Sequence, residues 1–158
     1  MSKIQFKLIS PGDHETIELI AQWYEIQWNI PASVTIKKIN AFSTNGLERQ
    51  VIMLLENSPV ATAGIYHHVS LVDKVPRFGM YKHWLALVYT LPAHRNKGLG
   101  ALVCNYMQDQ AKALGIAQLY LFTHTAETLY TRLGWHPIER LELGGKNIAV
   151  MKKDLAYL

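Results

Sequence analysis

Short apolar runs and helical spacings alternate along the chain and divide it into strands and helices. Apolar runs bounded by Gly, Pro, Asn or Asp predict strands at 4–9, 50–56, 60–69, 84–89, 117–122, 135–143 and 147–153. Helices are predicted at 13–27, 31–42, 98–114 and 126–133. Asp13 is a candidate N-cap of the first helix. Residues 70–81 contain Asp73, Pro76 and Gly79 and are predicted to form a loop.

The order of these elements predicts an α/β fold. A helix connects strands 84–89 and 117–122, which can therefore lie parallel, whereas the hairpins elsewhere require antiparallel pairs. We expect a twisted mixed sheet of about seven strands, with helices on both faces. No repeat, low-complexity tract or linker divides the chain, so residues 1–158 are expected to form a single domain.

Composition narrows the class of protein and its partners. The chain has 158 residues, 49% hydrophobic and 18% charged, as is typical of a soluble globular domain. Its net charge of +4 is diffuse, so we do not expect nucleic acid as a partner. No apolar stretch approaches the roughly 18 residues of a membrane helix, and neither end resembles a targeting signal. Because Cys104 is the one cysteine, a cytoplasmic location is expected. The sequence leaves a homodimer open.

The segment that most suggests chemistry connects a buried strand to the amphipathic helix after it. Gly98 and Gly100 would let an anion approach the backbone at the first turn of that helix, where free N–H groups and the helix dipole attract negative charge. Arg95 and Lys97 add positive charge. A tight turn without a ligand also explains the glycines. A P-loop fits poorly, because Lys97 precedes the glycine where that motif has it after the glycine. A Rossmann fingerprint also fits poorly, because Val103 stands where that motif has its third Gly or Ala.

Two motifs occur together in the second half of the chain. Residues 88–100 read Val-Tyr-Thr-Leu-Pro-Ala-His-Arg-Asn-Lys-Gly-Leu-Gly, and residues 130–135 read Tyr-Thr-Arg-Leu-Gly-Trp. They resemble the GNAT superfamily of N-acetyltransferases, whose pyrophosphate loop is Arg/Gln-x-x-Gly-x-Gly/Ala and whose later helix carries Tyr-x-x-x-Gly-Phe/Trp/Tyr. The predicted element order also matches this family, so the resemblance covers most of the chain. The N-terminal third matches in element order only.

The resemblance implies that acetyl-CoA is the co-substrate and that two segments bind it. The backbone of Val88, Tyr89 and Thr90 would pair with the pantetheine arm as though it were another strand. The Val88 N–H could also polarise the thioester carbonyl. The pyrophosphate would be held by the amides of Arg95, Asn96, Lys97, Gly98, Leu99 and Gly100.

Tyr130 is the general acid that the resemblance implies. The leaving thiolate has a conjugate acid of pKa about 8.5, and a phenol with a pKa near 10 can protonate it if well placed. The alternative is that Tyr130 is an ordinary helix aromatic that packs on the sheet.

A general base is harder to identify. Alternation places residues 84, 86 and 88 on one face of their strand, and none of them accepts a proton. His83 would lie on the other face, with Leu85 and Leu87. His67 and His68 are predicted on the neighbouring strand, facing opposite sides. Either one could serve as the base, directly or through water, or both are ordinary strand residues. Glu56 and His124 are further candidates.

Aromatic residues gather where an acceptor could bind, and Trp28, Tyr66 and Trp84 are the candidates. Aromatic faces can hold an ammonium group, although core packing is the alternative for each residue. Few carboxylates lie in these segments, which disfavours a polycationic acceptor. We expect no metal, because the histidines lack ligand spacing and Cys104 has no cysteine partner.

The sequence therefore predicts an acetyl-CoA-dependent N-acetyltransferase. The acceptor would be a primary amine of a small molecule, a protein N-terminus or a lysine, which attacks directly in a ternary complex. A CoA-binding sensor or regulatory module would keep the loop without needing Tyr130. A small basic nucleic-acid-binding domain would need the concentrated Lys/Arg face that the chain lacks.

Overall fold

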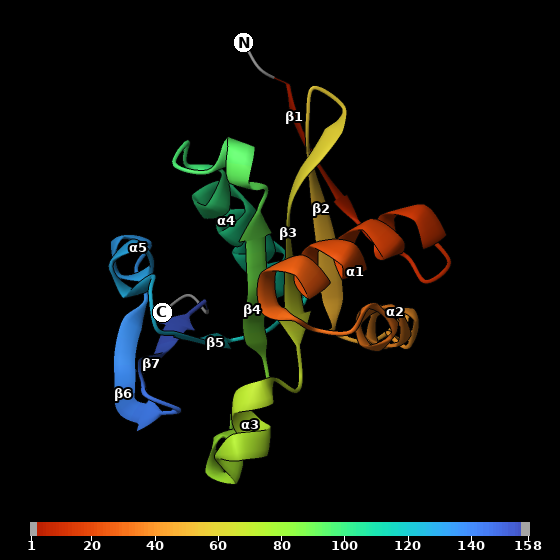
Figure 1. Ribbon diagram of the computed structural model, residues 1–158. Coiled ribbons are helices and arrows are strands. Elements are labelled where there is room, and N and C mark those ends of the chain that lie inside the picture. The colour runs from red at the N-terminus through yellow and green to blue at the C-terminus, as the bar shows by residue number, and fades with distance from the viewer. Residues whose placement is uncertain (1–2, 156–158) are drawn as a thin grey trace.

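Seven strands form one mixed sheet in the computed structural model, which describes residues 3–155 (Figure 1). The strands are β1 (Ile4–Leu8), β2 (Arg49–Leu55), β3 (Ser58–Tyr66), β4 (Trp84–Thr90), β5 (Gln118–Thr123), β6 (His136–Leu143) and β7 (Lys146–Asp154). Their order in the sheet is β1-β2-β3-β4-β5-β7-β6. The β4–β5 pair is parallel, and the other five pairs are antiparallel. The predicted mixed sheet is confirmed.

Helices cover both faces of this sheet, as the sequence predicts (Figure 1). They are α1 (His14–Trp28), α2 (Ala32–Asn40), α3 (Ser70–Lys74), α4 (Leu99–Ala113) and α5 (Glu127–Arg132), with short 3₁₀ turns η1 (Pro76–Met80) and η2 (Pro92–His94). Side chains alternate along β2, so Val51 packs with Val103 of α4 while Ile52 packs with Ile20 of α1. The sheet therefore separates two hydrophobic cores, one beneath α4 and one beneath α1 and α2.

In the first half of the chain the structure corrects the prediction for residues 70–81 and adds detail to the one for Asp13. Residues 70–81 are not an irregular loop, because Leu71 and Phe78 are buried and hold α3 and η1 against the second core. Pro76 begins η1, where its missing N–H costs nothing. Asp13 is the N-cap residue of α1, as predicted, but its side chain makes no capping hydrogen bond; its Oδ2 accepts the N–H of Ser10 at 2.9 Å instead.

Strand β4 contains a bulge that breaks the predicted alternation. Ala86 pairs with Gly64 and Tyr89 with Thr62, so Leu87 and Val88 both stand opposite the one residue between them on β3. Leu87 takes a positive φ of 53°. As a result Leu87 joins Ala86 on the α1 side, and Val88 packs on the α4 side. The prediction that residues 84, 86 and 88 share one face is therefore wrong, as is the grouping of Leu87 with Leu85.

Candidate active site

The sheet opens between β4 and β5. These strands are joined at the pair Trp84–Tyr120, where the Tyr120 N–H donates to the His83 carbonyl at 3.0 Å, and no further β4–β5 pair occurs in residues 3–155. Beyond that pair the two strands diverge (Figure 1). Tyr89 and Thr90 pair with β3 on one side, so the other edge of β4 faces the opening. An extended ligand can pair with such an edge as an added strand would.

The loop at the end of β4 presents free backbone donors. Asn96 and Gly98 both have positive φ, 63° and 78°, which turns the chain into α4. The N–H groups of residues 96–100 donate to no protein group among residues 3–155. Such groups at a helix N-terminus, next to the exposed Lys97, favour an anion.

The two loop glycines differ in what the fold requires of them. Gly98 has positive φ, so a side chain there is strained whatever the space around it. Gly100 lies inside α4, and a Cβ built on it would come no closer than 3.8 Å to any other group, the Thr90 Oγ1. The fold therefore does not need glycine at position 100. Free space beside unpaired amides fits the phosphate groups that the sequence motif implies.

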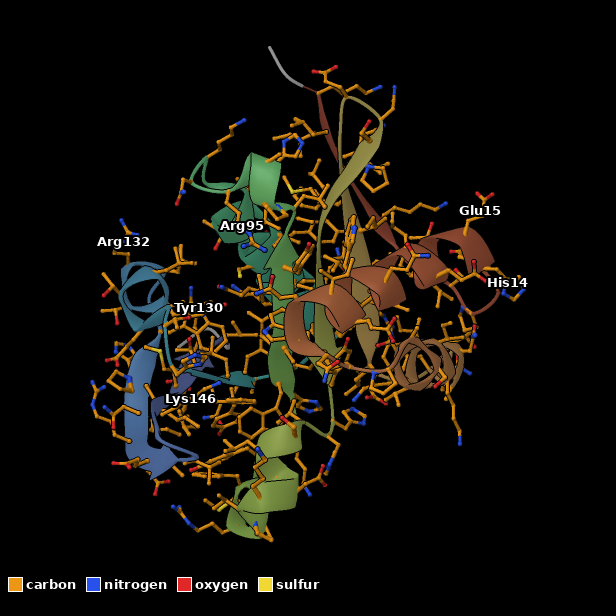
Figure 2. All side chains as sticks on the ribbon, in the orientation of Figure 1. His14, Glu15, Arg95, Tyr130, Arg132 and Lys146 are labelled. Atoms are coloured by element: carbon orange, nitrogen blue, oxygen red, sulfur yellow. The ribbon has the colours of Figure 1, made fainter. Side chains whose placement is uncertain are left out.

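The side chain of Arg95 connects the loop to the rest of the protein. Its Nε donates to the Thr90 carbonyl at 2.8 Å, its Nη2 donates to the Gln27 Oε1 of α1 at 3.0 Å, and its guanidinium lies 5.5 Å from the centre of the Tyr89 ring. Figure 2 shows Arg95 at the upper end of β4, close to the start of α4. In this conformation the guanidinium holds the loop against α1 and β4. The Thr90 carbonyl already accepts a hydrogen bond from it.

Tyr130 lies on α5 and projects toward β4 (Figure 2). It is 8% exposed and packs edge-on against Trp135, with 6.1 Å between the ring centres. Gly134 has a φ of 92°, and the N–H of Trp135 returns to the Tyr130 carbonyl at 3.0 Å. Packing therefore explains part of the Tyr-x-x-x-Gly-Trp motif. Burial raises the pKa of Tyr130 well above its usual value, and the Cys104 thiol beside it adds to that shift.

The aromatic acceptor candidates are not equally accessible. Trp84 is 0% and Tyr66 2% exposed, so neither offers a ligand much surface. Trp28, at the end of α1, is 40% exposed and meets the Tyr89 ring edge-on at 6.1 Å. Of the three, Trp28 is the one that can contact an acceptor in this conformation.

His67 and His68 do not lie on a strand, because β3 ends at Tyr66. Both are exposed; His67 Nδ1 lies 3.9 Å from Glu48, and His68 Nε2 lies 2.8 Å from Asp73. Tyr66 pairs with Trp84 at the start of β4, so these histidines lie near that end of the strand. Val88 is four residues further on, about 13 Å along an extended chain. Neither histidine is therefore close to the backbone expected to hold the thioester.

A cavity of about 270 Å³ opens at this same end of β4, away from the loop. Its lining includes Tyr81, Lys82, His83 and Tyr120 and none of the residues predicted to bind the cofactor. Burial, together with the nearby His67, lowers the pKa of His83. We assign the cavity no part in cofactor binding.

Two buried polar residues lie beside the bulge. Tyr24 of α1 and Gln50 of β2 are both fully buried, and the Tyr24 hydroxyl donates to the Leu87 carbonyl at 2.8 Å. Tyr24 shares a helix face with Ile17 and Ile20, so the sequence does indicate a buried hydroxyl in need of a partner. It does not indicate which partner.

Within residues 3–155, no group of three or more His, Cys, Asp or Glu side chains is arranged to hold a metal ion. None of the helices described is both long and apolar enough to cross a membrane.

Comparisons with known proteins agree with this geometry. The model of the acetyltransferase (GNAT) family matches residues 14–135. An aminoglycoside 6′-N-acetyltransferase solved with coenzyme A superposes with a TM-score of 0.74 at 12% identity, over 98% of each chain. The yncA protein of Salmonella typhimurium, solved with its cofactor acetyl-CoA, superposes with a TM-score of 0.73 at 16% identity, over 99% of this chain and 96% of its own. The aminoglycoside 6′-N-acetyltransferase of Enterococcus faecium gives 0.74 at 13% identity, over 98% of each chain. None of the curated proteins compared with the chain matches it.

Proposed function

Because the chain belongs to the acetyltransferase (GNAT) family, we propose that it transfers the acetyl group of acetyl-CoA to a primary amine by direct attack in a ternary complex. The observation that carries this proposal is the opening between β4 and β5, which ends at a loop with unpaired amides. The opening offers a strand edge to the pantetheine arm, and the loop offers N–H groups to the pyrophosphate.

The backbone of β4 supports the binding half of this proposal. The backbone N–H and C=O groups of Val88, Tyr89 and Thr90 on the free edge of β4 would pair with the pantetheine arm. The Thr90 carbonyl accepts from Arg95, so the pairing would rely on the remaining groups. The pyrophosphate would accept from the amides of residues 95–100, of which those at 96–100 are free of protein partners in residues 3–155. The Val88 N–H would donate to the thioester carbonyl, where negative charge develops.

Tyr130 would serve as the general acid when the C–S bond breaks. The amine nitrogen forms a bond to the carbonyl carbon, the electrons of the C–S bond pass to sulfur, and the phenol protonates that sulfur. Burial disfavours charge on both groups, because it raises the pKa of the adjacent Cys104 thiol to about 12 and also raises the pKa of the Tyr130 phenol. A CoA thiolate in the same environment would be similarly costly, so the role of the phenol would be to keep that sulfur from carrying a charge.

The amine must lose a proton before or as it attacks. No residue of the bulge can accept it, and His67 and His68 lie at the other end of β4. We therefore propose that the proton leaves through water.

Trp28 is the proposed contact for the acceptor. Its exposed face lies beside Tyr89, which belongs to the strand that would hold the thioester. The nearby Glu25 already accepts the Ala32 N–H at 3.1 Å, and a polycation needs several free carboxylates. An amine with an apolar or aromatic neighbouring group suits this surface better than an aminoglycoside does.

An acceptor screen tests the proposal. Purified protein and acetyl-CoA are mixed with peptide α-amines, lysine peptides, small aliphatic and aromatic amines, and aminoglycosides, and CoA release is followed with a thiol reagent. We expect one class to raise CoA release well above the hydrolysis rate and to gain one acetyl group by mass. Tight binding of acetyl-CoA without transfer to any class would indicate a CoA-binding sensor instead.

A further inference from the structure

A fully connected polar network lies buried between α1 and the sheet. Tyr24, Gln50 and Thr62 are 0% exposed, and Tyr66 is 2% exposed. The Gln50 Nε2 donates to the Tyr24 hydroxyl at 2.9 Å and to the Thr62 Oγ1 at 2.7 Å, and the Gln50 Oε1 accepts from the Tyr66 hydroxyl. Every member has a partner, so the arrangement resists change, because a buried polar group left without a partner keeps its full desolvation penalty.

The orientation of the Gln50 amide determines where two hydroxyl hydrogens point. Because Tyr24 and Thr62 each accept an N–H from Gln50, each turns its own hydrogen toward a backbone carbonyl. Thr62 donates to the Val51 carbonyl at 2.6 Å, and Tyr24 donates to the Leu87 carbonyl at 2.8 Å. The first carbonyl belongs to β2 and the second to the bulge of β4.

The bulge is a part of β4 that needs such support. Leu87 has a φ of 53°, a left-handed conformation that is strained for a residue with a side chain. It falls between the pairs Ala86–Gly64 and Tyr89–Thr62, where the regular pairing of β3 and β4 is interrupted. The Leu87 carbonyl and the Val88 N–H belong to one planar peptide group and point in opposite directions. A hydrogen bond that holds the carbonyl toward α1 therefore aims the N–H away from it.

We propose that Tyr24, oriented by Gln50, is a positioning residue that fixes the Leu87–Val88 peptide so that the Val88 N–H is preset to donate to the thioester carbonyl. This inference rests on the proposed function. A donor held in place before the reaction needs no reorganisation as charge develops. Loss of the Tyr24 hydroxyl would leave the N–H present but poorly aimed.

Two variants that each delete one hydroxyl of the network test the proposal. Tyr24→Phe removes the donor to the Leu87 carbonyl, and Thr62→Val removes the donor to the Val51 carbonyl. Both lose one buried hydrogen bond to a backbone carbonyl, so a purely structural role predicts similar behaviour. We expect Tyr24→Phe to lower kcat about tenfold or more, with CoA affinity changed less than about twofold. The reason is that a poorly aimed Val88 N–H would stabilise the transition state less, whereas the other contacts that bind CoA would remain. Thr62→Val should leave kcat within about twofold of wild type.

A second readout does not depend on finding the acceptor. The amide resonance of Val88 is compared between the CoA and acetyl-CoA complexes, since only the second ligand has a thioester carbonyl. We expect a clear difference in the wild type and in Thr62→Val, and a reduced one in Tyr24→Phe. If Tyr24→Phe does not fold, Gln50→Met replaces it, because it removes the group that orients Tyr24; a reduced difference is expected there too.

Equal behaviour of the Tyr24 and Thr62 variants in either readout would overturn the proposal. So would a Val88 resonance that responds to the acetyl group in Tyr24→Phe as it does in wild type. Failure of the proposed function looks different: wild-type protein would bind neither CoA nor acetyl-CoA, or would bind acetyl-CoA and transfer the acetyl group to no amine. In both cases the positioning role in catalysis would fall with it.

Discussion

At the residue scale, the two glycines of the loop have the same appearance in the sequence and different reasons to be glycine. Gly98 is required by its backbone, because its φ is 78°. Gly100 has an ordinary helical conformation with open space where a Cβ would lie. A substitution at Gly98 therefore changes both backbone strain and ligand binding. A substitution at Gly100 adds no backbone strain, so it reports on ligand binding alone.

Gly100→Ala should weaken acetyl-CoA binding while making the protein more stable. Alanine is favoured over glycine in a helix by up to about 1 kcal/mol, but the added methyl group would stand where a phosphate approaches the amides. We expect the Kd for acetyl-CoA to rise about tenfold, which corresponds to about 1.4 kcal/mol, and the Tm to stay equal or rise. Calorimetric titration and thermal unfolding measure both. The control is Asn105→Ala on the exposed side of the same helix, which should leave affinity unchanged. An unaltered Kd in Gly100→Ala would show that the pyrophosphate does not bind at this loop.

Tyr130→Phe tests the general acid. The ring and its contact with Trp135 remain, and the hydroxyl beside Cys104 is lost. We expect kcat to fall about 10²-fold, the usual scale for loss of acid catalysis, with little change in the Kd for acetyl-CoA. Tyr106→Phe is the matched control, because Tyr106 lies on α4 and stacks on Phe6. Near-wild-type turnover in Tyr130→Phe would mean that Tyr130 only packs.

At the scale of elements, the proposed site lies at one end of β4. The bulge places Val88 on the α4 side, α4 begins at the loop, and α1 contributes Tyr24 and Trp28 from the other face. The opposite end of β4 carries His83 and lies next to His67. This separation along one strand decides where a general base can and cannot be.

The pH dependence of kcat/KM should therefore follow the acceptor rather than a histidine. With water as the proton's exit, the rate rises as the amine itself deprotonates, and the midpoint shifts when a less basic amine is used. A histidine base would instead give a midpoint near 6.5 for every acceptor. The measurement uses two amines of different basicity, with wild type, His67→Ala and His68→Ala. An acceptor-independent limb near neutrality that disappears in one variant would identify that histidine as the base.

At the scale of the whole molecule, several weakly acidic groups are enclosed by the two cores. Burial raises the pKa of Tyr24 to about 12 and that of Cys104 to about 12. Burial also raises the pKa of Tyr66 and of Tyr130 well above the usual value. Each group must stay protonated in the folded state, whereas an unfolded chain can ionise it near pH 8.5 for cysteine and near pH 10 for tyrosine.

The free energy of unfolding should therefore fall steeply above pH 10. A folded pKa above the unfolded value gives stability that is complete below the unfolded pKa and is lost as pH rises toward the folded one. Each group contributes a slope of about 1.4 kcal/mol per pH unit within that window, here about pH 10 to 12 for Tyr24. Urea unfolding at pH 9, 10 and 11 (about one unit either side of the tyrosine value) measures the slope. Tyr24→Phe should reduce it by about 1.4 kcal/mol per unit, whereas Thr62→Val should lower stability equally at each pH. Identical slopes in wild type and Tyr24→Phe would show that Tyr24 ionises as easily in the folded protein as in the unfolded chain.

The sequence alone determined most of the elements, their order, the family and the position of the loop. These depend on local patterns: apolar spacing, turn residues, and a short motif whose glycines and helix start lie next to one another in the chain. The seven strands, the helices on both faces and the start of α4 follow the prediction closely.

Tertiary structure decided what each residue of the site faces. The bulge at Leu87 placed Val88 on the face opposite to the predicted one. Side chains alternate between the two faces of a strand, so one extra residue moves every later side chain to the other face. Packing buried Tyr66 and Trp84, left Trp28 exposed, and ended β3 before His67. Partners of polar groups come from distant parts of the chain: the Tyr24 hydroxyl meets the Leu87 carbonyl 63 positions away. Periodicity carries no information about such long-range pairs, since they form only when helix and sheet pack together.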